Sequence, residues 1–401
     1  MQVSPRSGTA RGGVVVSALL GLTLRPALTS VGALLDRIRA ATGLSPVLAA
    51  VVVATPLVCF AAGGWVAWVV RRRVGTARAV TGALVVVVAS SAYRVVGGPY
   101  VLWLGTITVC LGIAVLATLL PAIVKAAPAG RGRLTTAWTT ALGAGSAAGA
   151  MLTPPVAAAT SWSVGLAAWA LPAVAALVAW LLAARTPGDE APSSRPVVPS
   201  LRPRAPVVAL TIHFGLLAGA SCTLMGWLSP ILVDRAGVSA VDAAWMYGTS
   251  MTVGVLIAPF VPAWAARLPG QSAMVAAFAG WSLLGAAGLL VWPAAAPWLW
   301  SALIGMGMPS IVLALALISL RTNGPAGAAA LSSVVNAAGY GLACLVALAV
   351  GLLHAATGTW TAPLAALLVV LAGQAGTGFA AGRPAVISST AGSIAGEGGP
   401  A

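Results

Sequence analysis

The chain has 401 residues, of which 60% are hydrophobic and only 7% are charged, and its mean hydropathy is +1.00. Soluble domains carry about 25% charged residues, so the composition indicates an integral membrane protein and excludes a soluble ATP-hydrolysing domain. The net charge of +15 comes from short basic loops between apolar runs, which favours membrane topology over nucleic-acid binding.

The first apolar stretch, Val14 to Leu35, carries a charge near its middle. A helical rise of about 1.5 Å per residue places Arg25 roughly 16 Å along it, close to the bilayer centre. A charge at that depth is costly unless it faces protein, water or a counter-ion, so Arg25 is a candidate substrate anchor. The alternative is that it snorkels or bonds a neighbouring carbonyl. Thr29 adds a hydroxyl on the same face, unless it bonds back to its own helix, and Pro26 predicts a kink.

Charges, prolines and glycines divide the chain into twelve apolar segments, each about long enough to cross a membrane. Backbone groups must be satisfied in lipid, so all twelve are predicted to be helices. The predicted fold is an all-α integral membrane protein with two pseudo-symmetric six-helix bundles, 1–184 and 206–382. A Pro-, Ser- and Arg-rich stretch, 185–205, is predicted to be a flexible cytoplasmic linker, and the Gly-rich tail, 383–401, to be disordered.

Basic residues lie mainly on one side of these helices. With the N-terminus inside, all of them except Arg25 and a group of four fall on the inner side. The four outer residues are Arg37, Arg39, Arg94 and Arg235. This bias predicts a multi-pass protein of the cell membrane with both termini in the cytoplasm. Arg94, at the outer end of the third helix, is expected either at the membrane interface or in an external entrance for anions.

The two halves of the chain repeat each other in two places. Leu34-Leu35-Asp36-Arg37 recurs as Leu232-Val233-Asp234-Arg235, and Pro128-Ala129-Gly130 recurs as Pro325-Ala326-Gly327, at offsets of 198 and 197 residues. Paired halves of this kind are typical of secondary transporters, in which one bundle rocks against the other around a site near the midplane. The repeat therefore predicts a substrate site between the halves.

Several polar and aromatic side chains lie within the predicted helices. Asn336 and Tyr340 are one turn apart on the eleventh helix and are either substrate contacts or structural hydrogen-bond formers. By the repeat offset, Thr139 corresponds to Asn336, so both are expected near the central axis. Tyr247, in the eighth helix, is a candidate for stacking on a flat ligand. His213, in the seventh, is a candidate to carry a coupling proton or else lies near the cytoplasmic interface.

Four stretches are similar to a known family. They are Gly21 to Gly32, which reads GLTLRPALTSVG, Thr55 to Phe60, Leu120 to Lys125, and Gly351 to Gly358. With them the chain resembles the cyanate and 2-nitroimidazole transporter family of the major facilitator superfamily. The resemblance implies the twelve-helix major facilitator fold, alternating access, and Arg25 as a ligand contact. It also implies a small anionic or electron-rich solute, such as cyanate or a nitro-aromatic compound.

The loop between the second and third helices departs from the superfamily pattern. In this sequence Trp68-Val69-Val70 precedes the basic run, where the superfamily usually has an Asp. The resemblance implies a gating role for the loop, without the carboxylate that is expected to take part in it. The candidate gating residues are Arg71, Arg72, Arg73 and Arg78.

Acidic residues are absent from the predicted helices. They all fall in loops, linker or tail, namely Asp36, Asp189, Glu190, Asp234, Asp242 and Glu397. The expected transport is therefore facilitated diffusion, exchange, or coupling through His213 or the solute's own charge.

The predicted partners are the solute and the lipid bilayer, with a monomeric protein and no metal or cofactor. One rival is an efflux carrier of the same fold. Another is an intramembrane enzyme, whose nearest candidates, Ser221 and His213, lie two turns apart.

Overall fold

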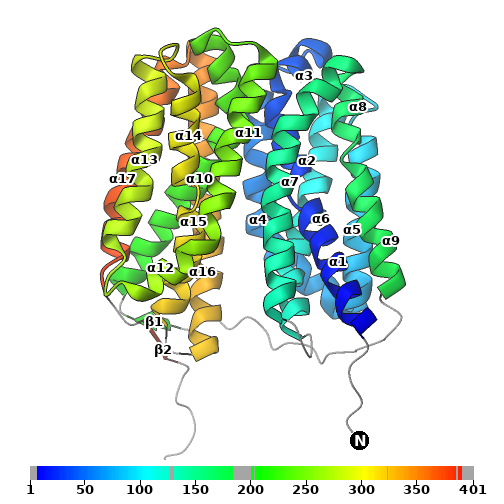
Figure 1. Cartoon of the computed structure of the whole chain (residues 1–401), viewed down its shortest axis with the longest axis vertical. Helices are drawn as coiled ribbons and strands as arrows, with labels where there is room; N and C mark the ends of the chain where they lie inside the picture. The colour runs from blue at the N-terminus through cyan, green and yellow to red at the C-terminus, as the bar shows by residue number, and fades with distance from the viewer. Residues whose placement is uncertain are drawn as a thin grey trace, which may run out of the picture.

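The computed structural model describes residues 7–126, 131–183, 200–202, 204–322, 324–384 and 387–390. Its helices run from one end of the molecule to the other in two groups that stand side by side (Figure 1). Eleven helical stretches are long and apolar enough to cross a membrane. The remaining predicted span is α7 (Arg131–Ala159), whose 29 residues are more than the roughly 20 needed to cross. The all-helical membrane fold predicted from the sequence is confirmed.

The first half contains six spans. α1 and α2 together form the first span, α4 to α7 form the next four, and α8 with α9 forms the sixth. The elements besides α7 are α1 (Ser7–Thr23), α2 (Pro26–Ala33), α3 (Leu35–Thr42), α4 (Pro46–Val74), α5 (Thr76–Tyr93), α6 (Pro99–Ala126), α8 (Trp162–Ala167) and α9 (Ala170–Ala183). The short α3 lies at the end of the bundle opposite the N-terminus of the chain (Figure 1).

The second half repeats this plan with a different set of breaks. The eighth and tenth spans of the molecule are interrupted near Pro259 and Pro309. The seventh span, which is the first of this half, is the continuous helix α10. The elements are α10 (Arg204–Ala236), α11 (Ala240–Ile257), η1 (Ala258–Phe260), α12 (Val261–Arg267), α13 (Ser272–Val291), α14 (Pro297–Gly307), α15 (Ser310–Leu320), α16 (Gly324–Thr357) and α17 (Thr361–Ala381). Proline interrupts a helix because it lacks an N–H and clashes with the preceding turn.

The turns before α4 and α11 show that the sequence repeat extends to local geometry. Gly43 and Gly237 adopt φ angles of 65° and 67°, a left-handed conformation that glycine tolerates best. Two residues later, Ser45 and Ser239 cap the following helices, and each hydroxyl accepts a backbone N–H of its helix. The same turn therefore reverses the chain at equivalent points in both halves.

Apolar packing occurs in three places. One cluster lies in the first half, one lies mainly in the second half but includes Ala54 and Leu57 of α4, and the third draws on both halves. This third cluster contains Leu35 and Ile38 of the first half together with Trp227, Leu228 and Trp360 of the second. It lies at the end of the molecule that carries α3, which we call the closed end. The opposite end, which carries the N-terminus in Figure 1, is called the groove end.

A small sheet lies at the groove end. β1 (Ser200–Arg202) pairs antiparallel with β2 (Ser388–Thr390), and the neighbouring Ile387 is buried and donates its N–H to the carbonyl of Arg321 at 2.6 Å. The predictions of a flexible linker over 185–205 and a disordered tail over 383–401 are wrong for these strands. Backbone groups far apart in sequence satisfy each other here, which composition does not reveal. Residues 184–199 and 391–401 lie outside the described residues.

Candidate functional site

The first membrane span is broken at Arg25. α1 ends at Thr23 and α2 begins at Pro26, so the two residues between them are not helical. A residue before proline is sterically disfavoured in the helical conformation, and Arg25 has φ −122° and ψ −37°. Its carbonyl oxygen accepts the N–H groups of Leu28 and Thr29, at 2.9 and 3.1 Å, which starts the new helix. The kink predicted at Pro26 is therefore a complete interruption of the span.

The side chain of Arg25 faces the second half of the molecule. It is half-buried, and no described residue forms an ion pair or a side-chain hydrogen bond with it. Its charge acts electrostatically on three side chains of α10, α11 and α16, which are Cys222, Tyr247 and Tyr340. The alternative that the guanidinium bonds a neighbouring carbonyl is thus not what the structure has. An unpaired cation between the halves can receive an anionic or electron-rich group.

Two tyrosines of the second half lie within reach of this charge. Tyr247 is only 1% exposed, and among the described residues its hydroxyl has no hydrogen-bond partner. Leaving a buried hydroxyl unpaired costs about 1–3 kcal/mol, which an acceptor group on a ligand would recover. Tyr340 is half-buried and packs its ring against Phe60 of the first half and Phe214 of its own half. Arg25, Tyr247 and Tyr340 are the predicted site residues that the structure brings together.

Asn336 and Thr139 lie on helices at the boundary between the halves, where α16 packs on α4 and α7 packs on α11. The side-chain amide of Asn336 donates to the carbonyl and the hydroxyl of Ser332, at 2.8 and 3.0 Å. The exposed Thr139 donates its hydroxyl to the carbonyl of Thr135 at 2.8 Å. In this conformation both side chains are therefore satisfied within their own helices.

The side chain of Thr29 packs against its own helix and α7. It is fully buried, and its hydroxyl lies 3.4 Å from the carbonyl oxygens of both Arg25 and Pro26. Gly149 of α7 packs against this hydroxyl so closely that a Cβ there would overlap it. Thr29 follows the alternative that the sequence left open, because it bonds back to its own turn and packs α2 on α7.

His213 lies inside the second half rather than between the halves. It is fully buried, and its Nδ1 is 3.0 Å from the carbonyl oxygen of Gln374 on α17. Because a carbonyl only accepts, Nδ1 is the nitrogen that carries the proton. Gly378, one turn further along α17, leaves the space that the imidazole fills. In this conformation the His213 side chain therefore faces α17.

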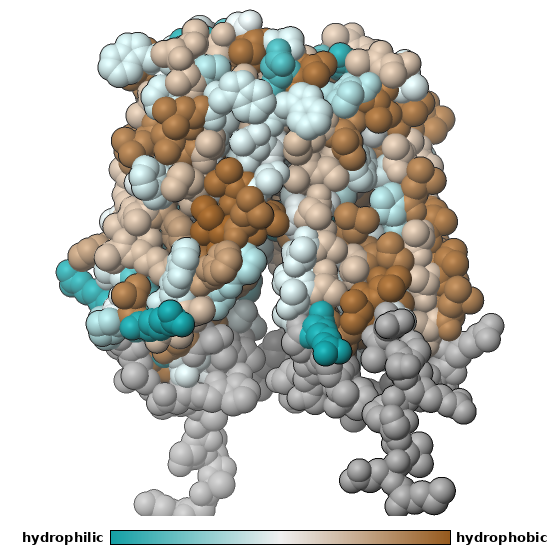
Figure 2. Space-filling view, viewed as in Figure 1, coloured by the Kyte–Doolittle hydropathy of each residue, from teal (hydrophilic) through white to brown (hydrophobic). Residues whose placement is uncertain are grey.

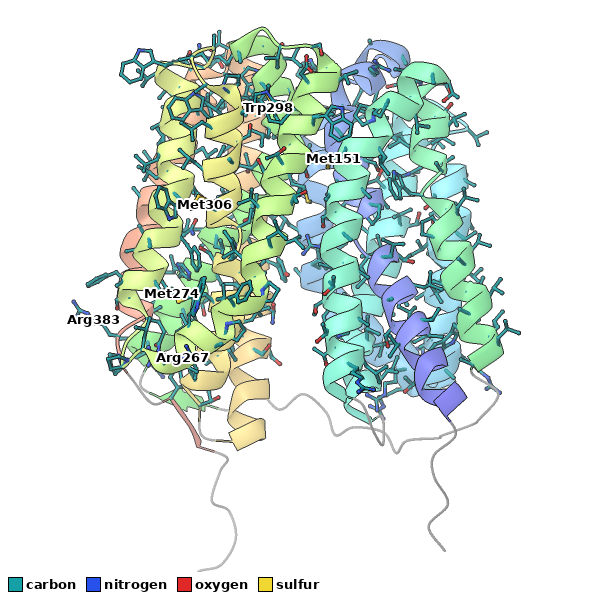
Figure 3. All side chains as sticks on the ribbon, viewed as in Figure 1. Met151, Arg267, Met274, Trp298, Met306 and Arg383 are labelled. Carbon is teal, nitrogen blue, oxygen red and sulfur yellow. The ribbon has the colours of Figure 1, made fainter. Side chains whose placement is uncertain are left out.

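Glycines bring the two halves into backbone contact at the closed end. A Cβ on Gly32 would overlap the carbonyl of Met225, and a Cβ on Gly226 would overlap Val53. Met151 of α7 lies at the boundary between the halves (Figure 3), where Gly248 of α11 gives it room. A small cavity of about 30 Å³ lies at this rim. Toward the groove end, by contrast, the space-filling view shows the halves separated by a furrow (Figure 2).

Known proteins resemble the chain over nearly its whole length, although no family model matches it. It is 30% identical to the 2-nitroimidazole transporter of Escherichia coli (strain K12), over 91% of this chain and 94% of that protein. It is also 30% identical to the cyanate transport protein CynX of the same organism, over 86% and 91%. The uncharacterized transporter YycB of Bacillus subtilis (strain 168) matches at 30%, over 91% and 92%. The chain belongs to the cyanate and 2-nitroimidazole transporter family of the major facilitator superfamily.

Solved structures confirm the fold of this transporter. The peptide transporter POT in complex with sulfate aligns with a TM-score of 0.74 at 14% identity, covering 92% of this chain and 93% of that one. The D-xylose-proton symporter aligns at 0.72 and 15%, covering 94% and 97%. At such identities the likeness shows the major facilitator fold alone. Together with the relatives, it makes the chain a secondary transporter with multiple membrane-spanning helices.

The predicted gating loop of the transporter connects α4 and α5. Three of its arginines form the last turn of α4 and the fourth lies in the first turn of α5, on either side of Gly75, whose φ is 81°. They are Arg71, Arg72, Arg73 and Arg78. Arg72 lies over the ring of Trp68 at 4.9 Å, and no carboxylate of the described residues pairs with any of the four. A gating role for them stays a prediction.

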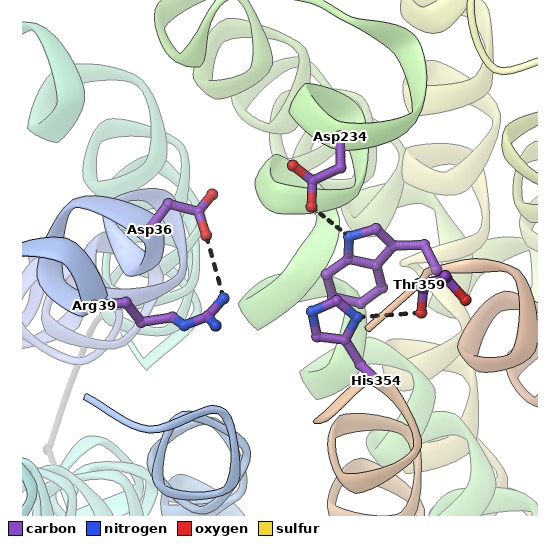
Figure 4. Close-up of polar contacts among 6 residues, drawn as sticks. Asp36, Arg39, Asp234, His354 and Thr359 are labelled. Carbon is purple, nitrogen blue, oxygen red and sulfur yellow. Dashed lines mark hydrogen bonds and ion pairs between the residues drawn. The ribbon is translucent and has the colours of Figure 1, made fainter. Parts of the chain in front are cut away.

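A cluster of charged and aromatic residues lies at the closed end of the transporter (Figure 4). Asp36 of the first half is 3.9 Å from Arg39. In the second half, Asp234 accepts the indole N–H of Trp360 at 2.8 Å, and His354 stacks on that indole at 3.7 Å. The Asp-Arg motif that is repeated between the halves thus places one carboxylate from each half at this rim. Burial raises the pKa of the Asp36 carboxyl, and the nearby Asp234 carboxylate raises it further.

Arg94 is a buried residue whose role the sequence did not indicate. It is fully buried, and its guanidinium donates to the carbonyl oxygens of Ala27 at 2.9 Å and Leu166 at 3.4 Å. The expectation of an interfacial or entrance position is wrong, because the side chain turns inward to brace α2 and α8. An arginine at the end of an apolar span gives no signal of this direction.

Proposed function

We propose that this transporter carries a small anionic or electron-rich solute, of the cyanate or nitroimidazole kind, by alternating access. The observation that supports this most is Arg25, a cation at the break of the first span that has no partner among the described residues. An anion or a nitro group supplies the missing acceptor, and charge-assisted hydrogen bonds are among the strong ones. Two relatives at 30% identity are named for cyanate and for 2-nitroimidazole.

The asymmetry between the two ends supports alternating access around this site. The closed end is sealed by packed backbone, and the groove end is furrowed (Figure 2). The bias of basic residues supports a place in the cell membrane with the groove end and both termini in the cytoplasm. A monomer suffices in this proposal, because the two halves of one chain supply Arg25, Tyr247 and Tyr340.

Uptake into vesicles that contain the purified protein tests the proposal. The probes are labelled cyanate and labelled 2-nitroimidazole, compared between the native protein and the variant Arg25→Gln. A hydrogen bond to a charged group is worth about 1.5–3 kcal/mol, so we expect uptake of the transported probe to fall roughly tenfold or more.

The matched control is Arg133→Gln, which removes an exposed arginine at the groove end of α7 and leaves uptake unchanged. Equal uptake by the native protein and Arg25→Gln would remove Arg25 from the site. Transport of a hydrophobic dye but of neither probe would favour the rival, an efflux carrier.

A further inference from the structure

One pair of stacked aromatic rings joins the two halves of the described chain. Phe60 of α4 and Tyr340 of α16 have ring centroids 5.8 Å apart and planes inclined by 25°. Phe214 of α10 meets Tyr340 edge-on, at 5.2 Å and 82°, and is itself buried. Phe60 and Tyr340 are both only half-buried. Phe214 therefore fixes the position of the Tyr340 ring by an edge-on contact. Part of the surface of the Phe60–Tyr340 pair remains exposed.

The depth of this pair in the molecule follows from the closed-end contacts. Gly226 meets both Gly32 of α2 and Val53 of α4, so these three residues lie at one level. Arg25 lies seven residues from Gly32 and Phe60 lies seven residues from Val53, each in the direction of the groove end. Seven helical residues span about 10 Å, so Arg25 and Phe60 lie at the same depth. Tyr340 also lies within electrostatic reach of the Arg25 charge, in agreement with this common depth.

We propose that Phe60 and Tyr340 form a stacking platform that selects flat ring solutes. The nitro or anionic group of such a solute reaches Arg25 while its ring lies on the open face of the pair. A solute ring inserted between Phe60 and Tyr340 would need about 7 Å between their ring centroids. These centroids are 5.8 Å apart, so the solute ring stacks on an outer face of the pair. A linear ion such as cyanate has no ring and binds at Arg25 without using the platform. This proposal rests on the proposed function. It predicts that the platform contributes to binding of ring solutes such as 2-nitroimidazole and does not contribute to binding of linear ions such as cyanate.

Concentration-dependent uptake into vesicles tests the platform, with labelled 2-nitroimidazole and labelled cyanate as probes. Phe60→Leu keeps an apolar side chain and removes the ring. Aromatic stacking geometry contributes roughly a 3- to 10-fold change in affinity, so the half-saturation concentration for 2-nitroimidazole should rise by that factor. The value for cyanate should not change. Phe60→Tyr keeps the ring and should retain the native value for both probes.

The chain offers a matched control. Phe260 stacks on Trp264 at 5.8 Å and 22°, almost the same geometry, but both residues belong to one half and Phe260 is 56% exposed. Phe260→Leu should leave both half-saturation values unchanged. Size-exclusion chromatography reports folding of every variant, and Tyr340→Leu repeats the test from the other half if Phe60→Leu does not fold.

The outcomes separate the two proposals. Loss of uptake in Arg25→Gln, with equal or no effect of Phe60→Leu on the two probes, would overturn the platform and leave the proposed function in place. A ring-specific effect of Phe60→Leu together with full uptake by Arg25→Gln would support the platform and reject Arg25 as the anchor. A native protein that takes up neither probe would overturn both.

Discussion

The closed end and the groove end of the boundary between the halves are built differently. At the closed end Gly32 and Gly226 let backbones of opposite halves touch, and a shared apolar cluster surrounds them. Toward the groove end, side chains such as Thr139 and Asn336 bond within their own helices and make no hydrogen bond across the boundary. Closure at this end thus depends on glycine at these two positions. We therefore expect substitutions here to disturb the transport cycle most.

The largest effect is expected from a side chain placed at Gly32. In Gly32→Val the new Cβ would overlap the carbonyl of Met225, so the closed end cannot form as it does here. We expect transport to fall at least about tenfold, because a clash of well over 1.4 kcal/mol in one state shifts the equilibrium by that factor. The measurement is uptake, together with maleimide labelling of Ser229→Cys, whose position lines the small cavity at this end. Labelling should become faster.

Gly82→Val is the control for this substitution. Gly82 lies on α5, and a Cβ there meets nothing within 4 Å, so uptake and labelling should match those of the native protein. Native uptake by Gly32→Val would show that the closed end does not require this contact.

The sequence predicted the spans and their principal charge because both are local properties. Twenty apolar residues specify a membrane helix regardless of its neighbours, and a proline after Arg25 disfavours helix at that residue in any fold. Local sequence was therefore enough to predict both a disturbance of the first span at Pro26 and a candidate role for Arg25.

The directions in which side chains point were not predictable in the same way. A soluble helix shows its buried face by an apolar stripe, but lipid and protein interior are both apolar, so a membrane helix carries little of this signal. The sequence did not distinguish Thr29 packed on α7 from Thr29 beside a solute. It likewise gave no means to see that His213 faces α17 or that Arg94 turns inward.

His213 gives the next largest effect, and it falls on stability rather than on transport. In His213→Leu the bond to the Gln374 carbonyl, which lies within the second half, is lost. The Gln374 carbonyl keeps the Thr377 hydroxyl as a partner, so the loss of this one hydrogen bond costs about 0.5–1.5 kcal/mol and we expect a melting temperature a few degrees lower. The half-saturation concentration for the transported probe should be unchanged at pH 6 and pH 8. A pH dependence of uptake that disappears in the variant would restore His213 as a coupling residue.

A smaller effect is expected from pH at the closed end. Burial and the facing carboxylate of Asp234 raise the pKa of Asp36, against the opposing charges of Arg39 and His354. These causes weaken when the halves part, so the closed conformation binds the proton more tightly. Acid therefore favours closure below the ordinary pKa of 3.8, and this preference is lost as the pH rises through the raised value. The labelling rate of Ser229→Cys, divided by that of a small free thiol at the same pH to remove the effect of the thiolate fraction, should fall as the pH decreases from 6 to 4.

Solvent limits the size of this change, because the Asp36 side chain is 49% exposed. We expect less than about a threefold change in labelling rate, in line with the weak electrostatics of exposed groups. Asp36→Asn should make this normalised labelling rate independent of pH over the same interval. An undiminished pH effect in Asp36→Asn would assign it to other groups at this rim.

The smallest effect is expected at the groove end, from Thr139→Ala. The threonine hydroxyl bonds only carbonyls of its own helix, those of Thr135 and Thr136, so its loss should change the half-saturation concentration less than about twofold. A rise well above that would mean that the groove end closes onto the solute through α7 in the other half of the cycle. Asn336→Ala, at the repeat-related position, then gives the decisive comparison. If both side chains meet one solute in that state, their effects will not add in the double variant.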